Sequence, residues 1–205
     1  MKSRLWLAGI AMLTIAATAD AQERGVTFGI GTSLNPTAIF AGDGDLVLLP
    51  VGLGNIYFPL IIGSSFKLEP EFGLLRVSEK TTDGTTSSES SATLTRLGIG
   101  AFWVAPIRES FRAYVGPRVG IVRNSESSRF GTGPERKMTQ TNLVLELATG
   151  GEYLFSSHFS LGGEVRLTYI NVGEREVTPP PPPSLFERSA SILTTNALIL
   201  LRWYL

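Results

Sequence analysis

Hydrophobic and polar side chains alternate residue by residue along most of the chain. In "FRAYVGPRVGIV", apolar residues from Phe111 to Ile121 fill every second position, and arginines and glycines dominate the positions between them. A period of two is typical of β-strands, whose successive side chains point to opposite faces. Turn-forming residues divide this pattern into eight predicted strands, at 25–34, 52–62, 66–79, 92–104, 111–123, 139–155, 159–172 and 190–205.

The connections between these strands alternate in length. The short ones are 63–65, 105–110 and 156–158, and the long ones are 35–50, 80–91, 124–137 and 173–189. This alternation puts every short turn at one end and every long loop at the other, which predicts an antiparallel up-and-down meander in one domain. The adjacent Leu74 and Leu75 interrupt the alternation in the third strand, so we expect a β-bulge or a register break there.

Two kinds of barrel fit this alternation: a soluble, lipocalin-like barrel with an apolar interior, and a membrane barrel with an apolar exterior. The polar face is rich in glycine, which suits the narrow interior of an eight-stranded barrel. Its charges are nearly balanced, which suits a buried network in which each charge is paired. These observations favour the membrane barrel with a lumen charge network of Lys67, Glu69, Glu71, Arg96, Arg112, Arg118, Glu146, Glu152, Glu164, Arg166 and Arg202.

Aromatic residues on the apolar face gather at the end with the short turns. They are Phe66, Trp103, Phe111, Tyr153, Phe155, Phe159 and Trp203. Aromatic side chains prefer the interface between bilayer and water, so these residues predict a girdle on the periplasmic side. Tyr169 lies ten residues beyond Phe159. At about 3.3 Å per residue and a tilt of about 40°, the band between them is roughly 25 Å tall, as in outer-membrane barrels.

The last strand, "TTNALILLRWYL", alternates to the final residue. We expect it to pair with the first strand, because closing the barrel leaves no strand edge exposed to lipid. Its apolar positions, Ala197, Ile199, Leu201, Trp203 and Leu205, then face lipid. Asn196, Arg202 and Tyr204 face the lumen.

The N-terminus predicts export. "MKSRLWLAGIAMLTIAATADAQ" has two basic residues, an apolar stretch and Ala19-Asp20-Ala21, which is the pattern of a signal peptide cleaved after residue 21. The apolar run is shorter than the ~20 residues that a membrane anchor needs. Residues 22–205 then form the barrel domain.

The 18 basic and 18 acidic residues give no basic surface for nucleic acid, and the absence of cysteine excludes disulfides and thiolate metal sites.

Five segments of the chain carry a resemblance to a known family. They are the signal peptide, "RLGIGAFWVAP", "FRAYVGPRVGIVR", "GGEYLFSSHFSLGGEVRLTY" and "TTNALILLRWYL". The chain resembles the small eight-stranded outer-membrane barrels of the OmpA- and OmpX-like superfamily. The resemblance implies an eight-stranded antiparallel transmembrane β-barrel in the outer membrane of a Gram-negative-type envelope, in contact with outer-membrane lipid. It also implies insertion by the barrel-assembly machinery, although Leu205 stands where the insertion signal usually has Phe.

Little in the sequence suggests catalysis. His158-Phe159-Ser160 resembles the His-x-Ser pair of outer-membrane lipid A deacylases, but His158 lies in a short turn at the periplasmic end, away from the outer leaflet. Asp43 and Asp45 lie in a Gly-rich loop without the distant Glu of a calcium loop. The prolines at 179–183 predict an extended spacer. We therefore predict no catalytic, cofactor-binding or metal-binding residue.

The sequence favours a structural or surface-interaction protein, with a plugged polar lumen and long extracellular loops that have room for an extracellular ligand. The first alternative is a narrow or gated pore for small solutes. The second is an outer-membrane lipid-modifying enzyme.

Overall fold

The computed structural model describes residues 25–34, 53–84, 86–131, 133–178 and 190–205. The predicted signal peptide, the pair Asp43 and Asp45, and the proline run lie outside these residues. The strands are β1 (Val26–Leu34), β2 (Leu53–Tyr57), β3 (Leu60–Ile62), β4 (Phe66–Asp83), β5 (Thr86–Arg108), β6 (Phe111–Phe130), β7 (Arg136–Leu154), β8 (Phe159–Val172), β9 (Arg175–Thr178) and β10 (Ala190–Tyr204). Among the described residues, no helix has the length and apolarity to cross a membrane.

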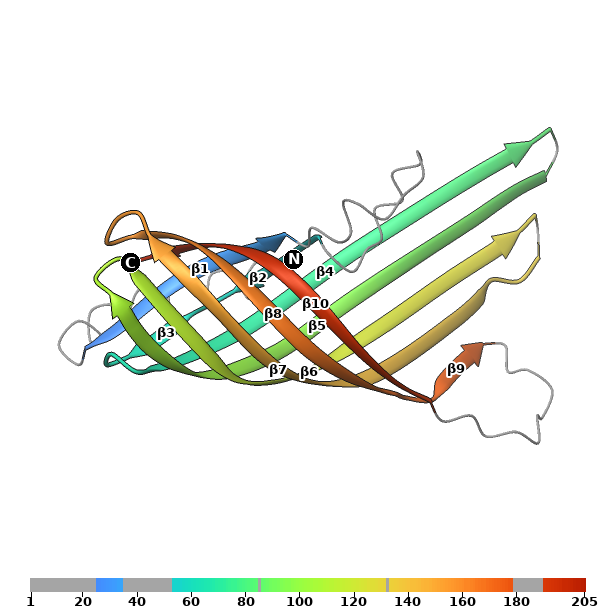
Figure 1. The fold of residues 1–205 in the computed structure, drawn as a ribbon. Coiled ribbons are helices and arrows are strands. Elements are labelled where there is room, and N and C mark those ends of the chain that lie inside the picture. Colours follow the sequence, from blue (N-terminus) through green and yellow to red (C-terminus); the bar gives the residue numbers. More distant parts are fainter. Residues whose placement is uncertain (1–24, 35–52, 85, 132, 179–189) are drawn as a thin grey trace.

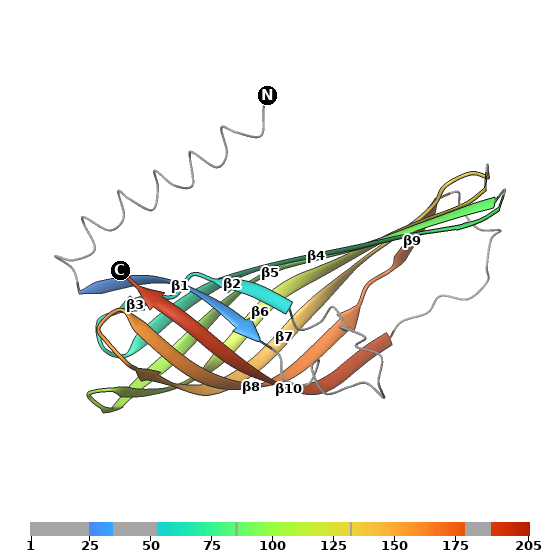
Figure 2. The same ribbon diagram turned by 90° about the horizontal axis from the view of Figure 1, so that it is seen from above.

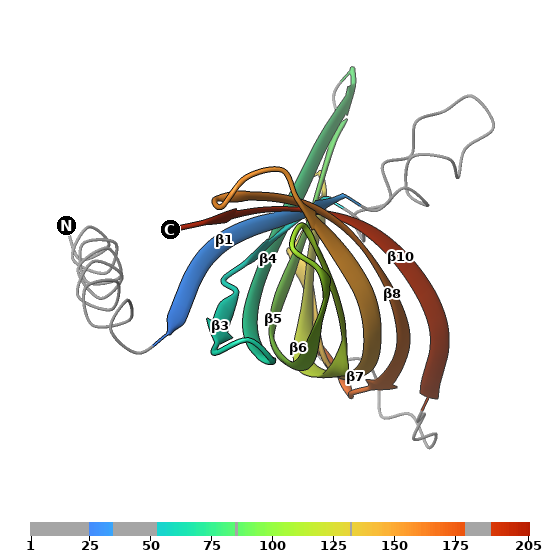
Figure 3. The same cartoon turned by 60° about the vertical axis from the view of Figure 1, so that its left-hand side comes forward.

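The strands form one antiparallel sheet that closes on itself (Figures 1 and 3). From β3 to β8 each strand pairs with the next, and β8 pairs with β10. The last strand, β10, pairs with β1 from Gly29 opposite Tyr204 to Leu34 opposite Ile199. Both β2 and β3 lie between β1 and β4, so together they fill one position and the ring has eight. The prediction of an eight-stranded up-and-down barrel, closed by the last strand, is confirmed.

The strand predicted over 52–62 is interrupted at Phe58 and Pro59, where β2 ends and β3 has not begun. Proline has no N–H to donate to a neighbouring strand. The pairing is carried across the interruption by two other hydrogen bonds. Gly29 N donates to Pro59 O at 2.8 Å, and Phe58 N donates to Pro70 O at 2.9 Å.

Two local predictions were wrong. The pairing of β4 with β5 runs without a register shift from Phe66 to Asp83, so there is no bulge at the two leucines. Leu75 points to the inner face and is half-buried, while Leu74 points outward and is 57% exposed. The predicted turn over 105–110 is also shorter, because β5 continues to Arg108.

On the side of the long loops, strands β4 to β7 continue three to seven residues beyond their predicted ends, and β9 pairs with β7 beside them (Figures 1 and 2). Most of the predicted loops 80–91 and 124–137 is therefore strand. We refer to the parts of these strands that rise beyond the rest of the barrel, 76–83, 86–95, 123–130, 136–141 and 175–178, as the extended sheet. Its many serines and threonines suggested loops, but threonine is also a good strand former, and here each strand has a neighbour to pair with.

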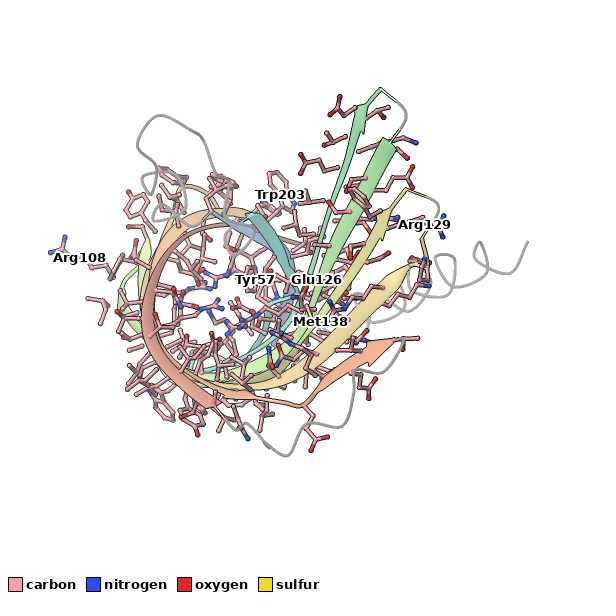
Figure 4. The ribbon with its side chains drawn as sticks, turned by 90° about the vertical axis from the view of Figure 1, so that its right-hand side faces the viewer. Tyr57, Arg108, Glu126, Arg129, Met138 and Trp203 are labelled. Atoms are coloured by element: carbon pink, nitrogen blue, oxygen red, sulfur yellow. The ribbon has the colours of Figure 1, made fainter. Side chains whose placement is uncertain are left out.

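The outward face of the barrel carries an apolar band that has the same height on the neighbouring strands β6 and β7. Its outward residues run from Phe111 to Ile121 on β6 and from Leu143 to Tyr153 on β7, and most are 36–55% exposed. Each run spans ten residues, which corresponds to roughly 25 Å of bilayer at the usual tilt. The inner face carries the charged side chains, as Figure 4 shows in the view along the barrel. A soluble barrel would have the opposite distribution.

Candidate functional site

Ten charged side chains meet inside the barrel and form one connected network of ion pairs. They are Lys67, Glu69 and Glu71 of β4, Arg96 of β5, Arg118 of β6, Glu146 and Glu152 of β7, Glu164 and Arg166 of β8, and Arg202 of β10. Five are cationic and five are carboxylates, so the network is formally neutral. Nine of these side chains are at most 3% exposed, and that of Arg96 is 18% exposed. We call this set the lumen network.

Arg118 lies at the centre of the lumen network. Its Nη2 donates to Glu69 Oε1 at 2.7 Å, and its Nη1 donates to Glu71 Oε2 at 3.1 Å. Glu146 is its cross-strand neighbour in register, but Arg118 Nε lies 3.8 Å from Glu146 Oε2 and forms no hydrogen bond there. The closest partners of Arg118 therefore come from β4, the next strand but one in the ring, rather than from the adjacent strand β7.

Three further arginines complete the pairing of the carboxylates. Arg96 donates to Glu71 at 2.5 Å and to Glu146 at 2.7 Å. Arg166 donates to Glu164 at 2.5 Å. Toward the end with the short turns, the two nearest oxygens to Arg202 are those of Glu69 at 2.7 Å and Glu152 at 3.3 Å.

Three tyrosine hydroxyls are hydrogen-bonded to the lumen network. Tyr114 OH donates to Glu164 at 2.9 Å, and Tyr204 OH donates to Glu152 at 2.8 Å. Tyr57 OH accepts from Arg166 Nη2 at 3.1 Å and is labelled in Figure 4. Tyr57 was not predicted from the sequence, because Pro59, two residues later, interrupts the alternation that would assign its side chain to a face.

Lys67 is bound differently from the arginines. Its Nζ lies 3.5 Å from Glu69 Oε2 and 3.4 Å above the centre of the Tyr114 ring, with the Phe102 ring at 4.7 Å. It has no hydrogen-bond partner among the described residues. Its charge is therefore held by the aromatic faces together with Glu69, which is a cation–π arrangement.

Arg112 was predicted in this set, and the structure does not bring it in. It lies opposite Glu152 in register, but it is only half-buried, and no described carboxylate lies within 4 Å of it. Arg112 is close to the end of β6, where its long side chain reaches water. Its absence leaves five cations against five carboxylates in place of the predicted six against five.

Glycines leave the space that the lumen network needs. A Cβ added to Gly98 would lie 2.8 Å from Glu71 Oε1, and one added to Gly100 would collide with the ring of Phe102. Both glycines are on the inner face of β5, beside Arg96. The glycine-rich polar face read from the sequence therefore lies against charged and aromatic side chains.

The seven predicted girdle residues lie at the end with the short turns, where β10 ends (Figure 1). Six are more than a third exposed, with Trp103 at 65%, and Phe159 is half-buried. Tyr153 and Phe155 pack edge to face, and Phe155 and Phe159 pack with their ring centres 5.9 Å apart. Trp203 lies on the outside of the barrel (Figure 4).

The inner face of the extended sheet holds a groove of about 490 Å³. Val77, Ala92 and Met138 are aligned across β4 to β7, with Glu126 between the last two. One row farther out, Glu79 of β4 and Arg136 of β7 are separated by two serines. We call this the rim groove: a partly apolar floor with acidic groups on β4 and β6 and basic groups on β7 and β9.

The model of one protein family, described as outer membrane protein beta-barrel domain, matches residues 5–179. The chain belongs to this outer-membrane β-barrel family. No curated protein matches the chain. Among solved structures, this outer-membrane barrel is similar to Ail, the attachment invasion locus protein of Yersinia pestis, with 12% identity over 87% of this chain and 93% of that one and a TM-score of 0.44.

Two other solved structures are similar to this outer-membrane barrel. Neisserial surface protein A (NspA) has 14% identity over 87% of this chain and 93% of that one, with a TM-score of 0.44. CarO of Acinetobacter baumannii has 7% identity over 88% of this chain and 97% of that one, with a TM-score of 0.38.

His158 and Ser160 of the outer-membrane barrel face different surroundings. His158 Nδ1 is 2.8 Å from Ser157 Oγ in the exposed turn. Ser160 is buried in the lumen, where its Oγ donates to Glu152 Oε2 at 3.2 Å. A serine nucleophile needs its base within hydrogen-bond reach, and the described geometry does not bring the histidine to this serine.

Two carboxylates at the outer end of the extended sheet are paired. A hydrogen bond from Lys80 Nζ to the cross-strand Glu89, at 2.5 Å, holds the pKa of the Glu89 carboxyl below its usual value. The pKa of the Glu135 carboxyl is also lowered, mainly by a hydrogen bond from Ser127 Oγ and to a smaller extent by the positive charge of Lys137. Because the pKa values of both carboxyls are depressed, these contacts stabilise the strand ends at any pH above the ordinary pKa of glutamate. The stabilisation is lost as the pH falls from there through the depressed values, because the carboxyls become protonated.

Proposed function

We propose that this outer-membrane barrel is a closed anchor that presents the extended sheet outside the cell as an interaction surface. The observation that carries the proposal is the continuation of β4 to β7, with β9, beyond a barrel whose interior holds the lumen network. A rigid sheet of paired strands holds its side chains in fixed positions, which suits recognition better than mobile loops do.

The lumen network supports the closed barrel. Eight strands enclose a space that side chains can fill. Here Arg166 of β8 reaches across it to Glu71 of β4, on the opposite side of the ring. The rings of Tyr57, Phe102 and Tyr114 also fill the interior and are at most 3% exposed. A permeating ion would have to displace these paired groups, which costs free energy because the charges would lose their partners.

The rim groove supports the interaction surface. Its floor offers Met138, whose flexible thioether adapts to different partners, and its walls offer charges of both signs. This combination fits a segment of an extracellular macromolecule that carries both charges and apolar side chains.

As predicted from the sequence, we retain residues 1–21 as a cleaved signal peptide, 22–205 as the barrel domain, and the barrel-assembly machinery as the insertion partner.

A shortened hairpin tests the interaction role. Val77 and Ala92 are opposite each other in register, so an Asn-Gly turn in place of residues 78–91 keeps the pairing of the remaining strands. We expect cells that make this variant to lose the protein-dependent part of their adhesion to surfaces coated with extracellular proteins or polysaccharides, because a wall of the rim groove is gone.

The matched control replaces only Gly84 and Thr85, the two residues between β4 and β5 in the sequence, by Asn-Gly. This variant should adhere like the unchanged protein. Both proteins should show the same heat-dependent shift in electrophoretic mobility, which reports a folded barrel. Full adhesion by the shortened variant would contradict the proposed role of the extended sheet.

A further inference from the structure

The outer face of the barrel changes from apolar to polar between two consecutive rows of residues. One row, aligned across β4 to β7, is Phe72, Leu97, Ile121 and Leu143, and these side chains are 37–48% exposed. The next row is Leu74, Thr95, Arg123 and Thr141, and the row after it is Arg76, Thr93, Ser125 and Thr139. Arg76 and Arg123 therefore lie immediately above the apolar band, at the level of lipid headgroups.

These two arginines differ from the other cations on the outer face of the extended sheet. Lys80 is paired with Glu89 at 2.5 Å, and Arg129 and Lys137 lie 3.7 and 3.5 Å from Glu135. Within the described part of the chain, no carboxylate lies within 4 Å of Arg76 or Arg123. The positive charge that remains without a protein partner is therefore concentrated at the membrane boundary.

The surroundings of the two arginines suit a large polar headgroup. Two strand spacings of about 4.8 Å and two residues of about 3.3 Å put their Cα atoms roughly 12 Å apart. Directly above Arg76 the outer face is hollowed by about 380 Å³. Its lining includes Ser78, Ser91 and Ser127, together with the ion-paired Lys80, Glu89, Arg129 and Glu135. Serine and threonine hydroxyls both donate and accept hydrogen bonds, as sugar hydroxyls require.

We propose that Arg76 and Arg123 bind the phosphates of an outer-leaflet lipid whose headgroup is a phosphorylated saccharide. Its acyl chains lie on the apolar row that includes Leu97 and Ile121, and its sugar faces the serines of the hollow. Guanidinium groups match phosphate with two parallel hydrogen bonds, and two arginines at this separation suit a headgroup with two phosphates. This inference rests on the membrane-barrel fold and is independent of the adhesion role of the rim groove.

The test is a titration of the purified protein in detergent with lipid A that carries both phosphates, followed by native mass spectrometry. The variant combines Arg76→Gln with Arg123→Gln. We expect its apparent affinity for the lipid to fall at least about tenfold, because two charges at a lipid surface are lost. The unchanged protein should bind dephosphorylated lipid A about tenfold more weakly as well.

The matched control combines Arg108→Gln with Lys137→Gln, which removes the same charge from residues that do not line the hollow. Its affinity should change less than about twofold, because Arg108 is at the opposite end of the barrel, beside a short turn, and Lys137 is already paired with Glu135. Equal losses in the two double variants would mean general electrostatic attraction and would overturn the site. Unchanged binding of dephosphorylated lipid by the original protein would overturn phosphate recognition.

Discussion

Replacing Arg118 by methionine should lower the free energy of unfolding of the barrel by about 3–5 kcal/mol, because breaking a buried ion pair leaves its partner charge without compensation. Arg118 is 2% exposed and hydrogen-bonds to both Glu69 and Glu71. The measurement is equilibrium unfolding in lipid vesicles. Arg112→Met is the matched control on the inner face of the same strand, and it should cost about 1 kcal/mol or less, since Arg112 has no ion pair among the described residues.

A double-mutant cycle separates pairing from simple loss of packing. Arg118→Met and Glu69→Gln together should cost much less than the sum of the single changes, because each removes the partner of the other. The same cycle with Glu146→Gln should show weaker coupling, since Glu146 lies 3.8 Å from Arg118 and Glu69 lies at 2.7 Å. Additive losses in both cycles would mean that the lumen charges do not act as pairs.

The second large effect is expected on the lipid face. Val115→Arg and Val165→Arg should each lower the free energy of unfolding by about 2–4 kcal/mol, because both positions are near the bilayer midplane. Val115 and Val165 are 47% and 52% exposed and flank Thr149 at the same height of the barrel. Each lies near the middle of the ten-residue apolar run of its strand.

Ser125→Arg is the control for these substitutions. Ser125 is on the same face of β6 as Val115, ten residues toward the extended sheet and above the apolar band. Arginine there should cost about 1 kcal/mol or less, as near a bilayer interface. Equal tolerance of arginine at Val115, Val165 and Ser125 would mean that this face does not contact lipid.

Side-chain parity made the barrel predictable from sequence. In strands such as 111–123 and 159–172, the charged residues and most glycines share one face, and the aliphatic residues share the other. Once the aliphatic face is taken to contact lipid, every other residue of the strand is assigned to the lipid or to the lumen. Parity also puts Arg118 and Glu146 on the same face of neighbouring strands, and the register of β6 and β7 in the structure brings the two opposite each other. Parity carries no information about contacts across the lumen, which depend on the curvature of the whole ring.

The ends of the strands were less predictable. The stretch 86–91 is serine- and threonine-rich, and nothing local distinguishes a loop from a paired strand in such a segment. This stretch is a strand because it pairs with β4 and β6. The paired part of β6 is distant in sequence, and that of β4 is as polar and ambiguous as the stretch itself. The rim groove and the boundary arginines could not be proposed before this pairing was known, because both are built from rows of residues across several strands.

The central claim is that the lumen network closes the barrel, and the most direct test is the conductance of the purified protein in planar lipid bilayers. A known porin in the same bilayer confirms that channels are detected. The lumen network predicts no steady current above that of the bare bilayer across the applied voltage range. Reproducible single-channel steps from the unchanged protein would contradict the claim and would favour a pore for small solutes.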